Sequence, residues 1–320
     1  MPALDMTINK LEKYTGTNPV PDDFDEYWDK ALKELDSLSF DYKLEPSGFT
    51  APGIKCDYLY FSGVGDARVA CKFLRQENIK GKIPAIAMFH GYSGDSGGWF
   101  SKLAYAYAGY AVLAMDVRGQ MGYSDDNLCV TGNTLRGHII RGLDSGDPDK
   151  LFFRNVFLDT AQVARILMNM DFIDENRIGA TGGSQGGALT ITCAALEPHV
   201  KMIAPIFPFL SDYKRVWEMD LCKGAYDELS YYIRSKDPRH KNIDKIFNML
   251  GYIDVSNLAP RIKAETYMFI SLLDDITPPS TQYACYNKIN AKKSNEIYPN
   301  HGHEALPESD ELIFEFFKHL

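Results

Sequence analysis

The sequence lacks the segments that carry a chain into or across a membrane. Residues 1–10 include Asp5 and contain no apolar core of signal-peptide length. No run elsewhere approaches the length needed to span a bilayer. Basic stripes that would neutralise nucleic-acid phosphates are also missing, and the net charge of −9 argues against nucleic-acid binding. For a chain of 320 residues, these absences predict a cytoplasmic protein that binds neither membrane nor nucleic acid.

Cysteine is scarce, and metal-ligand spacings are absent. The six cysteines are scattered without a C-x-x-C pair, and most lie in apolar stretches. Closely spaced histidines occur only at His301 and His303, which have another interpretation below. We therefore expect reduced cysteines that serve packing, with no disulfide framework, no metal site and no cofactor.

The stretch around Ser184 has the composition of a strand that turns at once into a helix. An apolar run at 177–180 suits a buried strand, and residues 189–195 suit a helix. Between them, Gly182-Gly183-Ser184-Gln185-Gly186 fits the G-x-S-x-G pattern of the nucleophile elbow in α/β-hydrolases. Glycines on both sides let the two backbones approach closely while the serine adopts a strained conformation. The competing interpretation is an ordinary strand-to-helix turn.

A second candidate loop follows an earlier buried strand at 83–89. His90-Gly91-Tyr92 leads there into a loop of small residues at 93–98. In α/β-hydrolases this position supplies one donor of the oxyanion hole, and the residue after the nucleophile supplies the other. We therefore expect the backbone N–H groups of Tyr92 and Gln185 to hold the oxyanion. The alternative for this loop is a turn before the next helix.

Strand and helix patterns alternate along most of the chain. An antiparallel hairpin is expected at 56–61 and 68–74, and a helical extension precedes it within residues 1–40. Later apolar runs predict strands at 83–89, 110–116, 201–207, 266–270 and 295–298, besides the strand before Ser184, and helices at 99–107, 153–170, 280–289 and 308–320. This alternation predicts a single domain over 1–320 with an α/β-hydrolase fold, in which helices cover both faces of a mostly parallel sheet.

Two segments depart from this alternation. Residues 124–150 are rich in Gly, Asp and Asn and predict a long loop. Residues 210–251 mix aromatic and charged side chains at helical spacing, which indicates a helical insertion before the acid loop. That insertion is expected to form a lid, an oligomer surface or additional packing helices.

A serine nucleophile needs a base that takes its proton and an acid that orients the base. In α/β-hydrolases these residues occur in the order serine, acid, histidine, each after a strand. Asp274 follows the strand at 266–270, and His303 lies in the loop before the final helix. We therefore expect a catalytic triad of Ser184, Asp274 and His303.

Both later members of this triad have a competitor. Asp275 is the competing acid, and consecutive residues leaving a strand cannot both face one histidine. His301 is the competing base. We prefer His303 because Gly302 frees the loop before it and Glu304 can anchor the turn after it.

Three motifs in this order resemble the signature of the acetyl xylan esterase / cephalosporin-C deacetylase family: Arg118-Gly119-Gln120, Gly182–Gly186 and His303-Glu304. Residues 273–281 also resemble that family's acid loop, and the resemblance runs from about residue 10 to the C-terminus. It is weakest at 210–251. Arg118 and Gln120 are expected to tie loops together by hydrogen bonds rather than to react.

The resemblance implies a serine esterase that releases acetate from xylo-oligosaccharides, other small acetylated sugars and cephalosporin C. It implies an intracellular homohexamer without a metal cofactor, and it carries the triad over to Ser184, Asp274 and His303 and the oxyanion amides to Tyr92 and Gln185. The alternatives are a broad-specificity short-chain carboxylesterase, an oligopeptidase-like serine hydrolase or a non-catalytic binding scaffold. The peptidase alternative is weak because the residues before the sheet are too few for a propeller.

Overall fold

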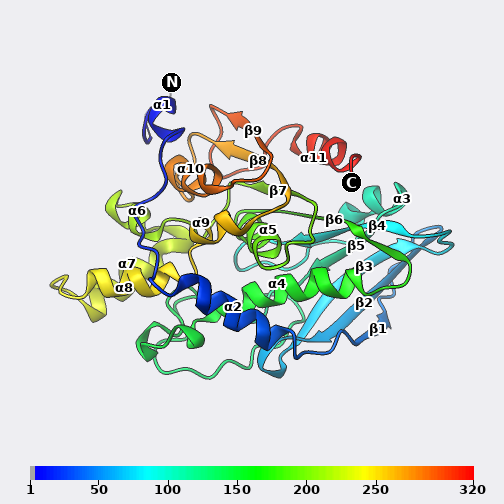
Figure 1. The fold of residues 1–320 in the computed structure, drawn as a ribbon, viewed down its shortest axis with the longest axis horizontal. Coiled ribbons are helices and arrows are strands. Elements are labelled where there is room, and N and C mark those ends of the chain that lie inside the picture. The colour runs from blue at the N-terminus through cyan, green and yellow to red at the C-terminus, as the bar shows by residue number, and fades with distance from the viewer. Residues whose placement is uncertain (1–3) are drawn as a thin grey trace.

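A nine-stranded sheet crosses the molecule in the computed structural model, which describes residues 4–320 (Figure 1). The strand order is β1-β2-β3-β5-β4-β6-β7-β8-β9. Pairing is antiparallel from β1 to β3 and between β3 and β5, and parallel in every other neighbouring pair. The strands are β1 (Tyr42–Pro46), β2 (Ile54–Ser62), β3 (Arg68–Gln76), β4 (Ile83–Phe89), β5 (Ala111–Met115), β6 (Ile173–Gly183), β7 (Met202–Ile206), β8 (Glu265–Ser271) and β9 (Lys293–Tyr298).

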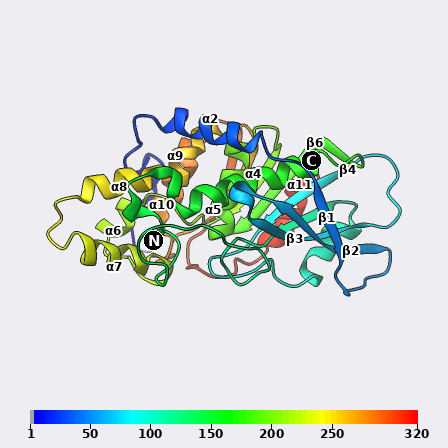
Figure 2. The same ribbon diagram turned by 90° about the horizontal axis from the view of Figure 1, so that it is seen from below.

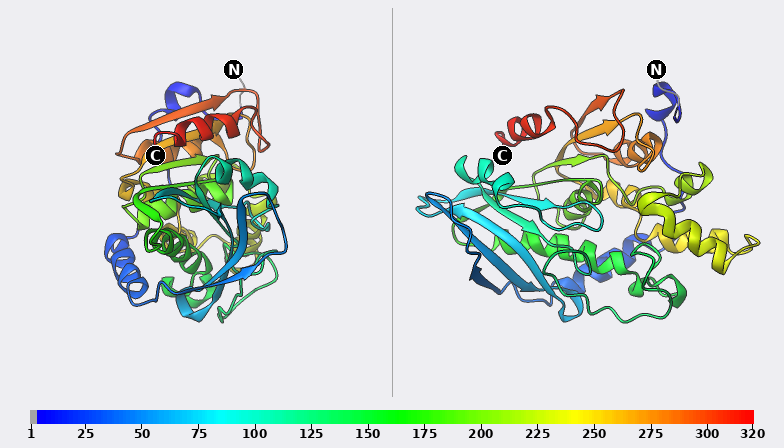
Figure 3. Two further views of the ribbon diagram at one scale, coloured as in Figure 1. Left: turned by 90° about the vertical axis from the view of Figure 1, so that its right-hand side faces the viewer. Right: turned by 180° about the vertical axis from the view of Figure 1, so that it is seen from behind.

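Helices supply most of the crossovers that parallel strands require. They are α1 (Ile8–Leu11), α2 (Phe24–Leu35), α3 (Leu103–Tyr107), α4 (Phe152–Met168), α5 (Gln185–Leu196), α6 (Tyr213–Glu218), α7 (Asp227–Lys236), α8 (Ile243–Gly251), α9 (Val255–Leu258), α10 (Pro279–Lys288) and α11 (Ser309–Phe317). The helices α4 and α5 cover one face of the sheet, and α3 and α11 cover the other (Figure 3). No helix within residues 4–320 is both long and apolar enough to cross a bilayer.

Successive side chains of the parallel strands enter different apolar layers. In β7, Ile203 belongs to a large buried cluster that includes Leu189 of α5. Its neighbours Met202 and Ala204 belong to a smaller cluster with Phe317 of α11. Strand side chains point to opposite faces in turn, so these strands are buried on both faces. The predicted mostly parallel sheet with two helical layers is confirmed.

The N-terminal segment forms the predicted helical extension. The apolar stripe of α2, which includes Trp28, is buried. Trp28 stacks on Phe157 of α4 with 6.0 Å between ring centroids. The predicted hairpin is also present, with β2 and β3 paired antiparallel so that Leu59 lies opposite Cys71.

Residues 210–251 are helical, as predicted, and α7 and α8 lie at the opposite end of the molecule from the β2–β3 hairpin (Figures 1 and 2). The aromatic side chains Tyr213, Tyr226 and Phe247 are buried in the large apolar cluster. Residues 210–251, called the insertion below, therefore share the apolar core of the sheet and its helices.

The structure differs from the sequence prediction in several elements, including the short helix α9, which was not predicted. The strand β1 was not predicted, because its alternation of apolar and charged residues is only five residues long and four of the five are exposed. The strand β6 begins at Ile173 rather than at Arg177, since the polar residues between them hide its first half. The expected loop at 124–150 contains two short 3-10 helices, Leu143–Ser145 and Pro148–Lys150.

The six cysteines are free, and four of them (Cys56, Cys71, Cys193 and Cys285) are buried. These four thiols serve packing, as the sequence indicates. Within residues 4–320, no group of three or more His, Cys, Asp or Glu side chains gathers as a metal site would require.

Candidate active site

Ser184 lies at the sharp turn between β6 and α5. Its backbone angles are φ 57° and ψ −116°, a conformation that a residue with a Cβ rarely adopts. Two hydrogen bonds to the segment at and after β7 hold the turn: Ser184 N–H donates to Ile206 O, and Ser184 O accepts from Phe209 N–H, both at 3.0 Å. The strained serine predicted from the motif is confirmed.

The glycines of the motif are required by close backbone contacts. A Cβ added to Gly182 would lie 2.4 Å from the carbonyl oxygen of Phe89, and one added to Gly186 would lie 2.1 Å from the same atom. Both distances are far below van der Waals contact. Strand β4 can therefore approach the turn only because both positions lack a side chain.

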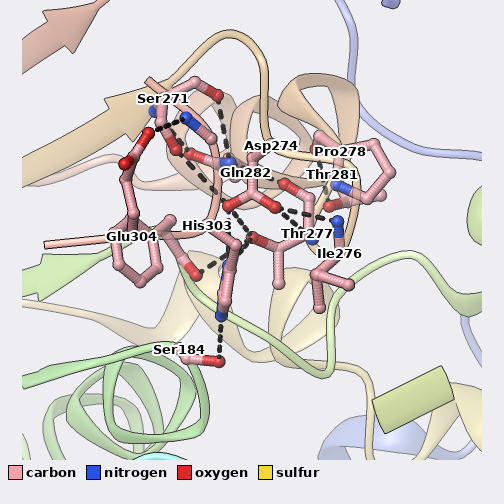
Figure 4. A network of polar contacts seen from close by, with 12 residues as sticks. Ser184, Ser271, Asp274, Ile276, Thr277, Pro278, Thr281, Gln282, His303 and Glu304 are labelled. Atoms are coloured by element: carbon pink, nitrogen blue, oxygen red, sulfur yellow. Dashed lines mark hydrogen bonds and ion pairs between the residues drawn. The ribbon is translucent and has the colours of Figure 1, made fainter. Parts of the chain in front are cut away.

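His303 connects Ser184 to Asp274 (Figure 4). Its Nε2 lies 2.9 Å from Ser184 Oγ, and its Nδ1 lies 2.8 Å from Asp274 Oδ2. A carboxylate only accepts hydrogen bonds, so Nδ1 carries the proton and Nε2 is free to accept one from the serine. The side chain of His303 keeps 22% of its surface exposed, which leaves this end of the site open to solvent.

Asp274 is completely buried and held by several donors. Its Oδ1 accepts the backbone N–H groups of Ile276 at 2.9 Å and Thr277 at 2.7 Å, and its Oδ2 accepts the Thr277 hydroxyl at 2.7 Å. A buried charge is tolerated when it is hydrogen-bonded in this way. The adjacent Asp275 points elsewhere and pairs with Lys223 at the surface. Asp274 is therefore the carboxylate that faces His303.

The competing histidine does not reach Ser184. His301 packs edge-on against Tyr298, and its Nδ1 has no hydrogen-bond partner within residues 4–320. Gly302 N–H donates to Glu304 Oε1 at 3.0 Å, so Glu304 anchors the turn as expected. This turn directs His303 toward Ser184.

The two amides predicted to hold an oxyanion have no internal acceptor. Within the described chain, neither Tyr92 N–H nor Gln185 N–H donates a hydrogen bond to another residue. Gln185 is the first residue of α5, where the helix dipole favours negative charge. Both N–H groups are therefore free to bind a ligand.

His90 shapes the loop that carries Tyr92. Its Nε2 accepts the N–H of Val117 at 2.9 Å, so its other nitrogen, Nδ1, is the donor to Gly91 O at 2.8 Å. Burial lowers the pKa of His90 below its usual value. A neutral ring with both nitrogens bonded makes His90 a structural residue.

Arg118 and Gln120 form hydrogen bonds rather than reacting, as expected from the sequence, and they tie the loop after β5 to α4 and α5. The guanidinium of Arg118 donates to both carboxylate oxygens of Asp159, at 2.6 and 2.7 Å, and both side chains are buried. Gln120 exchanges two hydrogen bonds with the side chain of Gln185, at 2.7 and 3.1 Å. This amide pair joins the first residue of α5, which directly follows Ser184, to the loop after β5.

Sequence reasoning missed two residues that contact the site. Thr277 binds Asp274 through both its hydroxyl and its N–H. Its spacing, three residues after an aspartate in a turn, is a signal that could have identified it. Glu228 receives a hydrogen bond from the Tyr92 hydroxyl. No local pattern marks Glu228, because 136 residues separate the two partners.

The arrangement is suited to nucleophilic acyl transfer. It combines a hydroxyl in contact with a histidine, a buried carboxylate on the far side of that ring, and two free amides, one of which begins a helix directly after the serine.

The whole chain, residues 1–320, matches the family model described as acetyl xylan esterase (AXE1). Acetyl esterase Axe7A of Xylanibacter ruminicola is 27% identical over 312 residues, and the match covers 94% of this chain but only 66% of that protein. Acetyl xylan esterase 1 from Thermoanaerobacterium sp. JW/SL YS485 superposes with a TM-score of 0.97 at 51% identity, over 98% of this chain and 99% of the other. Acetyl xylan esterase from Paenibacillus sp. R4 gives a TM-score of 0.93 at 30% identity, over the same shares of the two chains.

Proposed function

The chain belongs to the acetyl xylan esterase family, and on this premise we propose that it is a serine esterase that deacetylates acetylated xylo-oligosaccharides and related small acetylated sugars. Its fold is the α/β-hydrolase fold. The observation that carries the proposal is the continuous contact from Ser184 Oγ through His303 to Asp274, in a chain of this family.

In the proposed reaction, Ser184 Oγ attacks the acetyl carbonyl while His303 Nε2 takes the hydroxyl proton. The N–H groups of Tyr92 and Gln185 hold the resulting oxyanion. His303 then gives its proton to the departing sugar oxygen as the ester C–O bond breaks, which releases the sugar hydroxyl and leaves an acetyl group on Ser184. Water, activated by the same histidine, attacks this acetyl-enzyme and releases acetate.

The proposed role of Asp274 is to orient the base. Its carboxylate keeps the proton of neutral His303 on Nδ1, so that Nε2 faces the serine. It also stabilises the imidazolium that forms after proton transfer. The donors from Ile276 and Thr277 prevent the carboxylate from turning away.

The decisive experiment is acetate release from acetylated xylo-oligosaccharides, acetylated monosaccharides and cephalosporin C. We expect turnover of the first two, and loss of that turnover in Ser184→Ala with an unchanged unfolding temperature, because the hydroxyl is the nucleophile. Undiminished turnover in Ser184→Ala would remove this serine from the reaction. Equal rates on p-nitrophenyl acetate and butyrate would favour a broad carboxylesterase, and cleavage of a peptide anilide would favour a peptidase.

Three finer properties extend the proposal. The resemblance of the Arg118–Gln120, Gly182–Gly186 and His303–Glu304 motifs supports cephalosporin C as a second substrate, assembly into a homohexamer and a cytoplasmic location. Cephalosporin C is an arm of the experiment above. The hexamer is tested by light scattering, where a mass other than six chains would contradict it, and the location by cell fractionation.

A further inference from the structure

A buried carboxylate from the insertion contacts the loop that carries Tyr92. Glu228 lies in the first turn of α7 and is 3% exposed. Its Oε1 accepts the Tyr92 hydroxyl at 2.6 Å, and its Oε2 accepts the N–H of Ile140 at 3.1 Å. The Tyr92 hydroxyl oxygen in turn accepts the N–H of His138 at 2.8 Å. Three segments far apart in the sequence thus meet around one side chain.

The hydrogen-bond donors around Glu228 determine whether a carboxylate or an amide fits at this position. The Tyr92 oxygen already accepts from His138, so its only proton points to Glu228. Both oxygens of Glu228 therefore face donors. Burial raises the pKa of Glu228 to about 7, and the bonds from Tyr92 and the backbone act against that rise. In a glutamine at this position, the side-chain NH₂ group would face one of these donors, either the Tyr92 hydroxyl or the Ile140 N–H.

The surrounding chain is fitted to this side chain. Gly137 has φ 116°, and a Cβ added there would lie 2.4 Å from Glu228 Oε1. The ring of Tyr92 packs against Phe209, with 5.5 Å between centroids. Because its ring is packed and its hydroxyl is bonded to two partners, the Tyr92 side chain has little freedom to move. The backbone of Tyr92 is restricted with it.

We propose that Glu228 is a positioning residue for the oxyanion hole: by holding the Tyr92 hydroxyl, it keeps the Tyr92 backbone N–H in place beside that of Gln185. This inference rests on the proposed function. It gives the insertion a part in the reaction, although none of its residues contacts Ser184 or His303 through a hydrogen bond within residues 4–320.

The test compares two variants that cut the same hydrogen bond from opposite sides. Glu228→Gln keeps the size of the side chain and removes the charge. Tyr92→Phe keeps the ring and the backbone N–H and removes only the hydroxyl. Tyr232→Phe is the matched control, because Tyr232 also lies on α7 and donates to Asp144 at 3.1 Å without touching Tyr92.

We expect kcat for p-nitrophenyl acetate to fall about 10- to 100-fold in Glu228→Gln and in Tyr92→Phe, with KM within about twofold of wild type, because a misplaced donor weakens transition-state binding. The double variant falls no further than the more impaired single variant, since both changes break one connection. Tyr232→Phe keeps the wild-type kcat.

A second readout separates positioning from general damage. A trifluoromethyl ketone adds to the serine and leaves an oxyanion, so its inhibition constant should rise in parallel with the fall in kcat. Wild-type kcat in Glu228→Gln, an unchanged inhibition constant despite a lower kcat, or an equal loss in Tyr232→Phe would each overturn the proposal. If Glu228→Gln does not fold, Tyr92→Phe decides the question alone. Absence of esterase activity in wild type would instead remove the proposed function.

Discussion

At the scale of single residues, Asp274 and Asp275 are chemically identical, and only their surroundings differ. Asp274 is buried beneath His303 and accepts two backbone N–H groups. Asp275 lies at the surface beside Lys223, with 47% of its side chain exposed. An exposed ion pair of this kind contributes little to stability. The two positions therefore form a matched pair for testing the acid.

We expect Asp274→Asn to lower kcat by about 10³- to 10⁴-fold, because an amide can donate to Nδ1 and so favour the wrong tautomer of His303. Asp275→Asn should keep kcat within about twofold of wild type. Both are measured by p-nitrophenyl acetate hydrolysis, with the unfolding temperature as the control for folding. Equal losses in the two variants would contradict the assignment of Asp274.

At the scale of elements, the ends of strands and helices position the site. The turn from β6 to α5 is possible because Gly182 and Gly186 leave room for the backbone of Phe89. The start of α9, just after the insertion, is organised in a comparable way. Asp254 precedes α9, accepts the N–H of Ser256 at 2.8 Å and also accepts the N–H of Asp212 at 2.9 Å. A buried carboxylate thus joins two segments of the polypeptide.

Asp254 makes the stability of this region depend on pH. Burial, followed by repulsion from Asp212, raises the pKa of Asp254 from its usual 3.8 to about 6. Between about pH 4 and pH 6 the folded chain therefore binds more protons at this position than the unfolded chain. The contribution of Asp254 to the free energy of unfolding accordingly increases as the pH falls through this window.

We expect wild type to gain about 2 kcal/mol of unfolding free energy relative to Asp254→Asn between pH 7 and pH 4.5, because asparagine does not titrate. Urea unfolding of both proteins at the two pH values measures this difference, and the contributions of carboxylates that do not interact with Asp254 cancel. Parallel pH profiles for the two proteins would show that the pKa of Asp254 is not raised in the folded state.

At the scale of the whole molecule, the N-terminal extension joins parts of the chain that are distant in sequence. Trp28 of α2 is completely buried, stacks on Phe157 of α4 and donates its indole N–H to Tyr252 O at 3.1 Å. In Figure 1, the N-terminal end of α2 lies on the side of α7 and α8. Earlier in the extension, the side-chain amide of Asn18 donates to Phe247 O of the insertion at 3.4 Å. The extension therefore contacts both the helical layer on the sheet and the insertion.

Trp28→Ala should lower the free energy of unfolding by about 3–5 kcal/mol, through lost burial and a cavity that the helices cannot close. The kcat of the remaining folded protein should stay near that of wild type, since Trp28 is part of no contact at the active site. Phe100→Ala is the control, because Phe100 is 80% exposed and should cost less than about 0.5 kcal/mol. Similar losses in the two variants, measured by urea unfolding, would contradict this account.

The sequence by itself determined most of the helices and strands, and also the strand-to-helix turn that carries Ser184. The strained serine and its glycines could be predicted because the whole motif lies within five consecutive residues, Gly182–Gly186. The atom for which these glycines leave room belongs to the distant Phe89, and only the structure shows it. The parallel sheet could be predicted because apolar runs alternate with helical patterns. The exposed strand β1 was missed, since an alternation of only five residues, Tyr42–Pro46, is too short to distinguish an edge strand from a loop.

Only the tertiary structure decided which side chains meet. The sequence offered two acids and two histidines, and the direction of each depends on how the loops after β8 and β9 pack against each other. The contact between Tyr92 and Glu228 depends on the position of the insertion, and its partners lie 136 residues apart. Local spacing determines secondary structure, but contacts between distant segments follow from the packing of whole elements, and no short stretch of sequence contains that information.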